Sequence, residues 1–112
     1  MNDFFKDDIC FNVKAFARRV LAVRNNFLAK DFELNMDGYE FPIGDAEKLE
    51  SKLSSVWAEV IGFTAYCSAL KEGWIPSEGK SNVIISDLRK LEAHVTEAEL
   101  MFEILVNKAT KE

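Results

Sequence analysis

Few residues of this chain could do chemistry. His94 is the only histidine, and Arg89 stands five residues before it. A histidine can act as general base on a ribose hydroxyl, and a nearby arginine can stabilise the charge of the phosphate. Four acids lie in the same stretch: Glu92, Glu97, Glu99 and Glu103. Facing carboxylates could bind Mg²⁺, but the Glu-x-x-His motif of di-iron bundles is absent. We therefore interpret these acids as a solvated helix face.

The Arg89-x4-His94 spacing resembles that of the HEPN-type helical ribonucleases, and the length and expected helical class agree with that family. The resemblance rests on two residues, and Lys90 departs from the family pattern, in which a polar uncharged or acidic residue usually follows the arginine. It implies a ribonuclease with Arg89 and His94 as catalytic residues. On a regular helix, however, residues five apart point about 140° from each other. An acidic chain also lacks the basic cluster that RNA binding uses. The ribonuclease therefore stands as an alternative, and we expect that the protein is not an enzyme.

Other chemical motifs are missing from the sequence. One histidine without neighbouring cysteines does not make a usual zinc site, which needs three or four nitrogen or sulfur ligands. The five glycines do not form a phosphate-binding loop, and there is no serine nucleophile elbow. Cys10 and Cys67 fall on or beside apolar positions, where free thiols behave as small hydrophobes. We expect no cofactor, no metal and no disulfide framework.

The elements that must position these residues are three long helices. Apolar residues recur at alternating steps of three and four, which keeps them on one face of a helix. The first set is Ile9, Val13, Phe16, Val20, Val23 and Phe27. The second set is Ala46, Leu49, Leu53, Val56, Val60, Phe63, Cys67 and Leu70. The third set is Ile84, Leu88, Leu91, Val95, Ala98, Phe102, Leu105 and Ala109. We call these sets the three ladders.

The ladders predict an all-α fold, an antiparallel up-down-up bundle with helices at about 8–35, 46–72 and 81–107. A short extra N-terminal helix or a broken first helix would raise the number to four. Residues 1–112 form a single domain, because this length is near the commonest domain size. Asp7 or Asp8, Asp45 and Ser81 are the expected N-caps, and Gly38 and Gly73 the expected stops. We expect full burial for Phe16, Val20, Leu53, Val60, Leu91 and Phe102.

The charge is negative and unevenly distributed. Nineteen acids against fourteen bases give −5 in all. The net charge is +2 for residues 8–36, −4 for residues 37–72 and −2 for residues 73–112. Such a surface repels phosphates and anionic lipid. Since neither a secretory signal nor a membrane-length apolar run is visible, we expect a cytoplasmic protein that binds neither membrane nor nucleic acid directly. Arg18, Arg19 and Arg24 are interpreted as ion-pair partners for acids of the other helices.

With no chemical motif left, binding is the function that the sequence favours. We expect a small acidic inhibitor of a protein with a basic surface, as an immunity protein or antitoxin is for a nuclease toxin, or as a phage anti-defence inhibitor is. Nucleases are basic where they hold phosphates, so an acidic patch can associate fast and block the cleft. The expected contact residues are Glu47, Glu50, Glu59, Tyr39, Phe41 and Trp74. The loop residues Tyr39, Phe41 and Ile43 could instead plug the end of the bundle.

The competing class is a structural or adaptor module that forms a homodimer. Apolar residues in excess of the ladders could form its interface: Ile61, Ile85, Met101 and Ile104. A bundle of three helices also needs wider apolar stripes than a two-stranded coiled coil, so the same residues could complete the core. The sequence thus leaves monomer and homodimer open.

Overall fold

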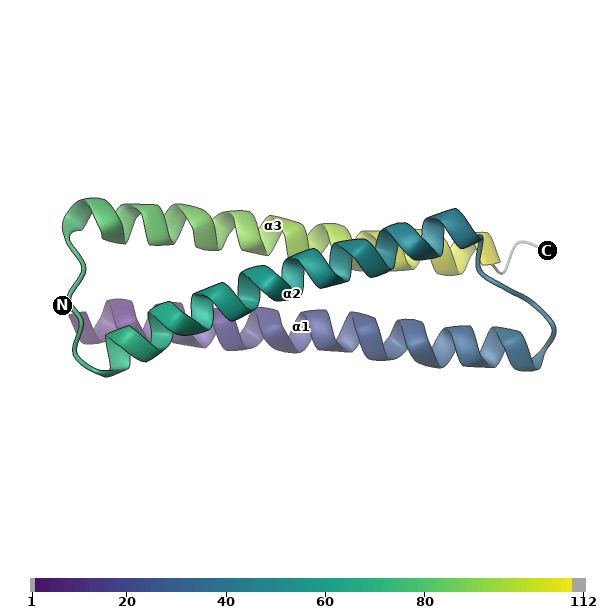
Figure 1. Cartoon of the computed structure of the whole chain (residues 1–112), viewed down its shortest axis with the longest axis horizontal. Coiled ribbons are helices and arrows are strands. Elements are labelled where there is room, and N and C mark those ends of the chain that lie inside the picture. Colours follow the sequence, from purple (N-terminus) through teal and green to yellow (C-terminus); the bar gives the residue numbers. More distant parts are fainter. Residues whose placement is uncertain (1, 110–112) are drawn as a thin grey trace.

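The computed structural model describes residues 2–109, and the side chains from residue 5 onward. It contains α1 (Asn2–Met36), α2 (Ile43–Lys71) and α3 (Glu78–Ala109), joined by two short loops. Each helix packs against both others. The chain runs up, down and up along a rod of 55 × 20 × 17 Å, with α2 crossing α1 and α3 obliquely (Figure 1). The protein is therefore an all-α three-helix bundle, as the ladders predict.

The core consists of the three ladders and little else. Nearly every ladder residue is buried, and Ile84, Leu91, Val95 and Ala98 of α3 are completely enclosed. No polar or charged side chain is buried within the described residues. Phe16, Val20, Leu53, Val60 and Leu91 are buried as predicted. Burial of apolar area, at roughly 25 cal/mol per Å², is therefore the main force that holds the helices together.

Phe102 departs from the prediction of full burial. It is only partly buried and packs against the edge of the core, while Leu105 three residues later is 2% exposed. Leu34 and Phe41 are buried although the first ladder stops at Phe27. The ladder pattern identifies the buried face of a helix but not how deeply a ring at its edge is covered, because neighbouring helices decide that.

The starts of the helices also differ from the predicted caps. α1 begins at Asn2, not near Asp7 or Asp8, and continues unbroken to Met36, so three helices are present. α2 begins at Ile43, where Ala46 N–H donates to the Pro42 carbonyl at 2.9 Å. Asp45 therefore lies inside the first turn and is not the N-cap. In α3 the backbone N–H of Lys80 donates to Ser77 Oγ at 3.1 Å. α2 and α3 thus start earlier than the predicted caps Asp45 and Ser81, at Pro42 and Ser77.

Gly38 and Gly73 end α1 and α2 as predicted. Their φ angles are 83° and 104°, in the left-handed region that favours glycine. After α1, Tyr39 N–H donates to the Leu34 carbonyl at 2.8 Å, and after α2, Trp74 N–H donates to the Ala69 carbonyl at 2.9 Å. Both closures are Schellman motifs, which fix the direction in which each loop leaves its helix.

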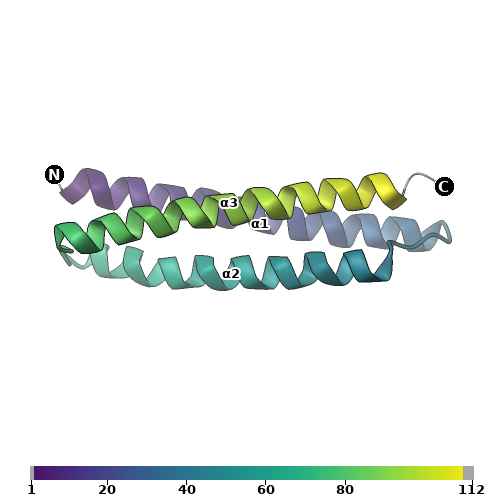
Figure 2. The same ribbon diagram turned by 90° about the horizontal axis from the view of Figure 1, so that it is seen from above.

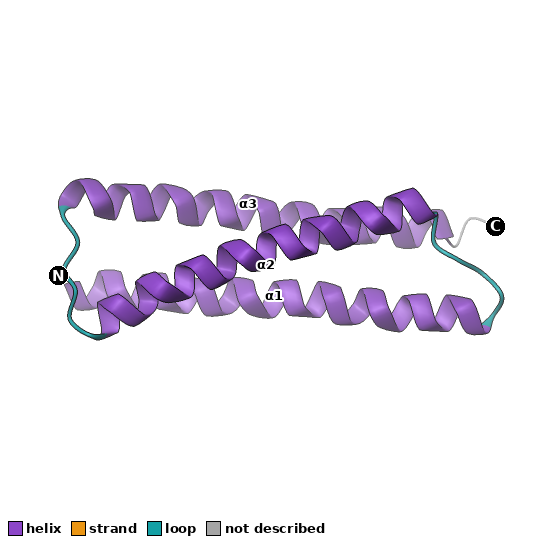
Figure 3. Ribbon diagram, viewed as in Figure 1, coloured by secondary structure: helices purple, strands orange, loops and turns teal. Residues whose placement is uncertain are grey.

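The loop between α1 and α2 is partly a plug. Phe41 is 4% exposed and stacks on Phe27, with ring centroids 5.5 Å apart. Tyr39 and Ile43 face solvent instead. The loops, teal in Figure 3, lie at opposite ends of the rod, and Figure 2 shows the same arrangement from above. Phe41 thus closes one end of the core and holds the loop in place.

The depth of burial predicts how the core responds to truncation. Leu91→Ala should lower the free energy of unfolding by about 2–5 kcal/mol, because it removes a completely enclosed side chain and leaves a cavity. Phe102→Ala should cost less than the roughly 3–5 kcal/mol typical of a fully buried phenylalanine. Urea denaturation followed by circular dichroism measures both. A larger loss for Phe102→Ala than for Leu91→Ala would contradict the observed packing.

Candidate binding surface

The histidine lies in an ion pair between two helices. His94 Nδ1 on α3 is 2.8 and 2.9 Å from the two carboxylate oxygens of Glu59 on α2. Both side chains are little more than a third exposed. A carboxylate on Nδ1 orients an imidazole, but no hydrogen bond joins this pair to a described serine, threonine or cysteine. Glu59 therefore connects α2 to α3 and is not a free acid on the surface.

Arg89 does not converge with His94. Both residues belong to the regular helix α3, so their side chains point about 140° apart. Arg89 is exposed, whereas His94 faces α2 through Glu59. The structure therefore does not bring the two residues of the ribonuclease alternative to one place within this chain.

Further ion pairs connect the helices. Arg19 of α1 forms a two-pronged contact with Glu99 of α3, at 3.0 and 2.6 Å. This hydrogen-bonded contact with Glu99 raises the pKa of the Arg19 guanidinium. Lys52 of α2 donates to Glu97 of α3 at 2.7 Å and lowers the pKa of that carboxyl. The arginine prediction thus holds for Arg19.

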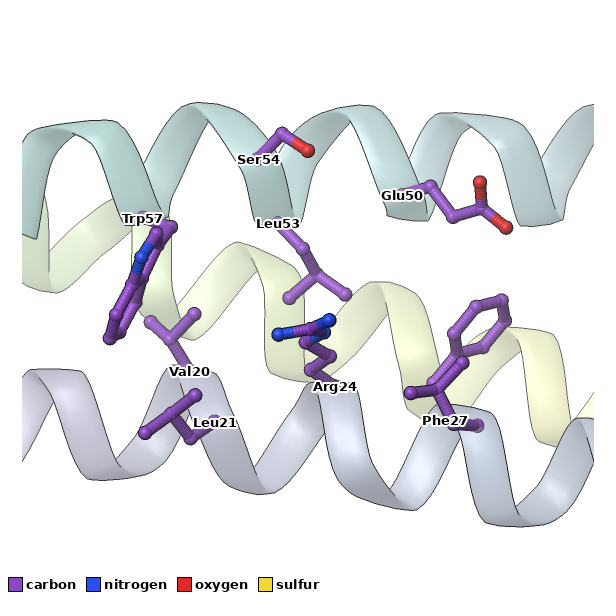
Figure 4. Close-up of a pocket in the computed structure, with 9 residues that line it drawn as sticks. Val20, Leu21, Arg24, Phe27, Glu50, Leu53, Ser54 and Trp57 are labelled. Atoms are coloured by element: carbon purple, nitrogen blue, oxygen red, sulfur yellow. The ribbon is translucent and has the colours of Figure 1, made fainter.

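Arg18 and Arg24, by contrast, form no ion pair with the described residues. Arg24 points from α1 toward α2, where it lines a groove with Glu50 and Trp57 (Figure 4). The groove is open, has a volume of about 400 Å³, and has mostly apolar walls that include Leu21, Leu28 and Leu53. The bundle therefore leaves an uncovered apolar strip beside α1.

The six expected contact residues do not form one surface. Glu47 and Glu50 are exposed near the start of α2, and Tyr39 is exposed in the adjoining loop. Trp74 lies in the other loop, at the far end of the rod, where it stacks on Tyr66 with ring centroids 6.2 Å apart. Phe41 is buried, so it cannot anchor a partner. Of the exposed residues among the six, Glu47, Glu50 and Tyr39 share an end of the molecule.

That end carries the excess charge of the chain. Residues 31–50 contain seven carboxylates and one lysine, a net charge of −6. They comprise the last turns of α1, the loop and the first turns of α2, and we call them the acidic tip (Figure 1). Within the described residues, only Asp45 and Glu33 of these acids form ion pairs, with Lys108 and Lys30. The other five are Asp31, Asp37, Glu40, Glu47 and Glu50.

Sequence reasoning located part of the acidic tip but not its boundary. The count over residues 37–72 includes Glu59 and Glu72, which lie away from it, and omits Asp31 and Glu33 on α1. The helices turn back on themselves at Gly38, and this brings acids from both sides of the loop together. Counting charges on both sides of a predicted turn would have found the tip.

The cysteines are enclosed thiols. Cys10 of α1 and Cys67 of α2 are both free and buried. Burial, together with a hydrogen bond to Cys10, raises the pKa of the Cys67 thiol to about 12. A thiol in this state is a poor nucleophile near neutral pH. Within the described residues, no group of three or more histidine, cysteine, aspartate or glutamate side chains could hold a metal ion.

Comparison with known proteins gives no relative. No protein-family model matches the chain, and neither a curated protein nor a solved structure matches it. Within residues 2–109, α2 alone is long and apolar enough to cross a membrane by length and composition. Core helices of bundles share this property, and seven residues of α2 are buried against α1 and α3.

The inter-helix ion pairs predict how stability changes in acid. Contacts with Lys108 and Lys52 lower the pKa values of Asp45 and Glu97, whose ordinary values are 3.8 and 4.5. A depressed carboxyl pKa stabilises the fold above the ordinary value, and this contribution is lost as the pH falls through the folded value. Thermal unfolding should therefore move to lower temperature below about pH 4.5.

The combined variant Asp45→Asn and Glu97→Gln should show a smaller difference in melting temperature between about pH 6 and pH 3 than the parent chain. Asp31→Asn is the control, because it removes a carboxylate that forms no ion pair within the described residues. If both variants left the change of melting temperature with pH as it is in the parent chain, the ion pairs of Asp45 and Glu97 would not contribute to stability.

Proposed function

We propose that this protein is a stoichiometric inhibitor that covers the basic surface of a protein partner with its acidic tip. The observation that carries the proposal is the net charge of −6 within residues 31–50, in a chain whose total is −5. Five of the acids have no ion pair within the described residues, so their charge is available to a partner. Elsewhere the described helices pair several acids internally, as Glu97 and Glu99 show.

A nuclease toxin is the partner class that this surface fits best. A nuclease must be positively charged where it binds phosphates, and a compact cluster of carboxylates presents the same sign of charge as a nucleic acid. Opposite potentials steer the two proteins together and raise the association rate by orders of magnitude. An immunity protein, an antitoxin or a phage anti-defence inhibitor would work in this way, in the cytoplasm and without turnover.

The tip also offers apolar contacts beside its charges. Tyr39 and Ile43 are 48% and 68% exposed, and they lie between Asp37, Glu40 and Glu47 along the chain. Exposed aromatic and aliphatic side chains surrounded by polar groups are typical of the residues that carry binding energy. Charge alone supplies speed of association, whereas burial of these side chains would slow dissociation.

The loop is held in place before binding. Phe41 stacks on Phe27, the Schellman motif fixes Tyr39 relative to α1, and Lys108 of α3 holds Asp45 at 2.7 Å. Ordering of loops and side chains is one of the main costs of association. A loop that is already ordered lowers that cost and keeps the carboxylates close together.

Binding kinetics against catalytic domains of basic nuclease toxins test the proposal. The combined reversal Glu40→Lys, Glu47→Lys and Glu50→Lys should slow association with the true partner at least about tenfold, while the helix content stays unchanged. The parent association rate should fall steeply between about 50 mM and 500 mM salt, because screening shortens the Debye length. Surface plasmon resonance measures both rates.

The matched control reverses Glu72, Glu78 and Glu92, which are exposed and lie outside the tip. It changes the net charge equally and should slow association much less. Glu59 is left intact, because its reversal would break the contact with His94. Equal effects of the two triple variants would refute the tip as the contact surface, and a partner insensitive to both would refute the electrostatic mechanism.

The ribonuclease alternative makes a separate prediction. Purified protein should not cleave single-stranded RNA, because Arg89 and His94 point apart on α3 and no basic cluster surrounds them. Gel assays with a labelled RNA measure cleavage in the parent, Arg89→Ala and His94→Ala. Cleavage by the parent that both variants abolish would establish an enzyme and overturn the proposal.

A further inference from the structure

Helix α1 has a second apolar face that no part of the described chain covers. Leu21, Leu28, Phe32 and Met36 are 37%, 52%, 68% and 73% exposed. Leu21 and Leu28 each follow a buried ladder residue, so they point about 100° away from the core. Asn25 lies on the same face. Positions 21, 25, 28 and 32 are then separated by four, three and four residues, which is the spacing of a coiled-coil seam. We call these five residues the outer row.

The charges of α1 change sign along the outer row. The bases Lys14, Arg18 and Arg24 precede its middle, and the acids Asp31 and Glu33 follow it together with Lys30, which pairs with Glu33. The three bases are exposed and form no ion pair with a described residue. Such a helix is complementary to itself when reversed about Leu28, because the segment that carries Arg24 then lies over the segment that carries Asp31.

We propose that the outer row binds a second copy of this chain, with the two α1 helices antiparallel and the two-fold axis near Leu28. In this register Leu28 meets Leu28 of the second copy, and Leu21 lies near its Met36. Asn25 lies near its Phe32, and Arg24 lies near its Asp31. A parallel pairing would instead stack bases on bases and acids on acids, at a cost in each like-charge contact.

The groove beside α1 extends the contact. Arg24, Leu21 and Leu28 form its α1 wall, and Trp57 stands on the opposite wall (Figure 4). Residues 21–36 span about 22 Å of helix, at 1.5 Å per residue. One helix pair of that length buries less than the roughly 800 Å² per partner of a stable interface. We therefore expect a reversible dimer with a dissociation constant in the micromolar range, which corresponds to a binding free energy on the order of −8 kcal/mol.

Sedimentation equilibrium of the full chain over about 1–300 µM tests this interface. The parent should fit a monomer–dimer equilibrium with midpoint in that range. Leu28→Ser should weaken the dimer at least tenfold, whereas Leu100→Ser should not change it. The two leucines are equally exposed, at 52%, but Leu100 lies on α3. Circular dichroism checks that both variants keep their helix content.

A charge exchange tests the antiparallel register. Arg24→Glu and Asp31→Arg should each weaken the dimer about fivefold, because each creates two like-charge contacts across the axis. The double variant should recover the parent affinity within about twofold. An oxidised Leu28→Cys chain should give a disulfide-linked dimer, since the residue lies next to its own copy, while Leu100→Cys should not.

Three results would overturn the proposal. They are a parent that is strictly monomeric at 300 µM, a dimer that Leu28→Ser leaves intact, and single charge variants that the double variant does not rescue. The first of these includes a monomeric parent whose outer row binds a foreign helix. The dimer stands independently of the inhibitor function, because the reversal of Glu40 and Glu47 alone changes partner binding without altering the outer row or the groove, which Glu50 lines.

Discussion

The structure depends on burial of one apolar stripe per helix. Only three helices share the core, so each can hide little more than a third of its circumference, and the ladder residues fill that share almost completely. No buried polar side chain helps to specify the arrangement within the described chain. Apolar burial fixes which faces meet, while contacts such as Arg19–Glu99 and Lys52–Glu97 connect specific residues of neighbouring helices across the rim of the core. Exposed pairs of this kind contribute modestly to stability but favour one pairing over others.

The same constraint shapes the surface. A thin rod of 55 × 20 × 17 Å has a large surface for its core, so apolar residues beyond the ladders must stay partly in water. Ile85 and Met101 pack against the core edge, whereas Ile61 and Ile104 remain exposed on different helices. The four residues expected to form a homodimer interface therefore differ in exposure and do not lie on one helix. The outer row is a longer set of exposed residues on one face of one helix than the pair Leu100 and Ile104 on α3.

The ladders made the fold predictable, since a regular spacing of up to eight apolar residues leaves little choice of which helix face is buried. Boundaries were harder, because Asp45 and Ser81 look like caps but each helix gains a further turn when the backbone near Pro42 or Ser77 starts it earlier. The site was least predictable. Phe41 and Tyr39 are neighbours in one aromatic loop, and only the packing of Phe27 against Phe41 decides which of the two is buried. In the same way, no spacing in the sequence indicates that Glu59 contacts His94, because the pair depends on the register between α2 and α3.

The acidic tip and the outer row impose a consistent geometry on the proposed assembly. Two tips of charge −6 repel each other strongly at short range, and salt screens that repulsion only beyond about 8 Å under physiological conditions. An antiparallel pair of α1 helices with its axis near Leu28 points the two tips in opposite directions, with the two Met36 residues about 24 Å apart along the pair at 1.5 Å per residue. The pairing that matches bases with acids along α1 is thus also the pairing that separates the largest like charges. Each tip keeps Tyr39, Ile43 and the exposed acids of α2 outside the contact formed by Leu21 and Leu28.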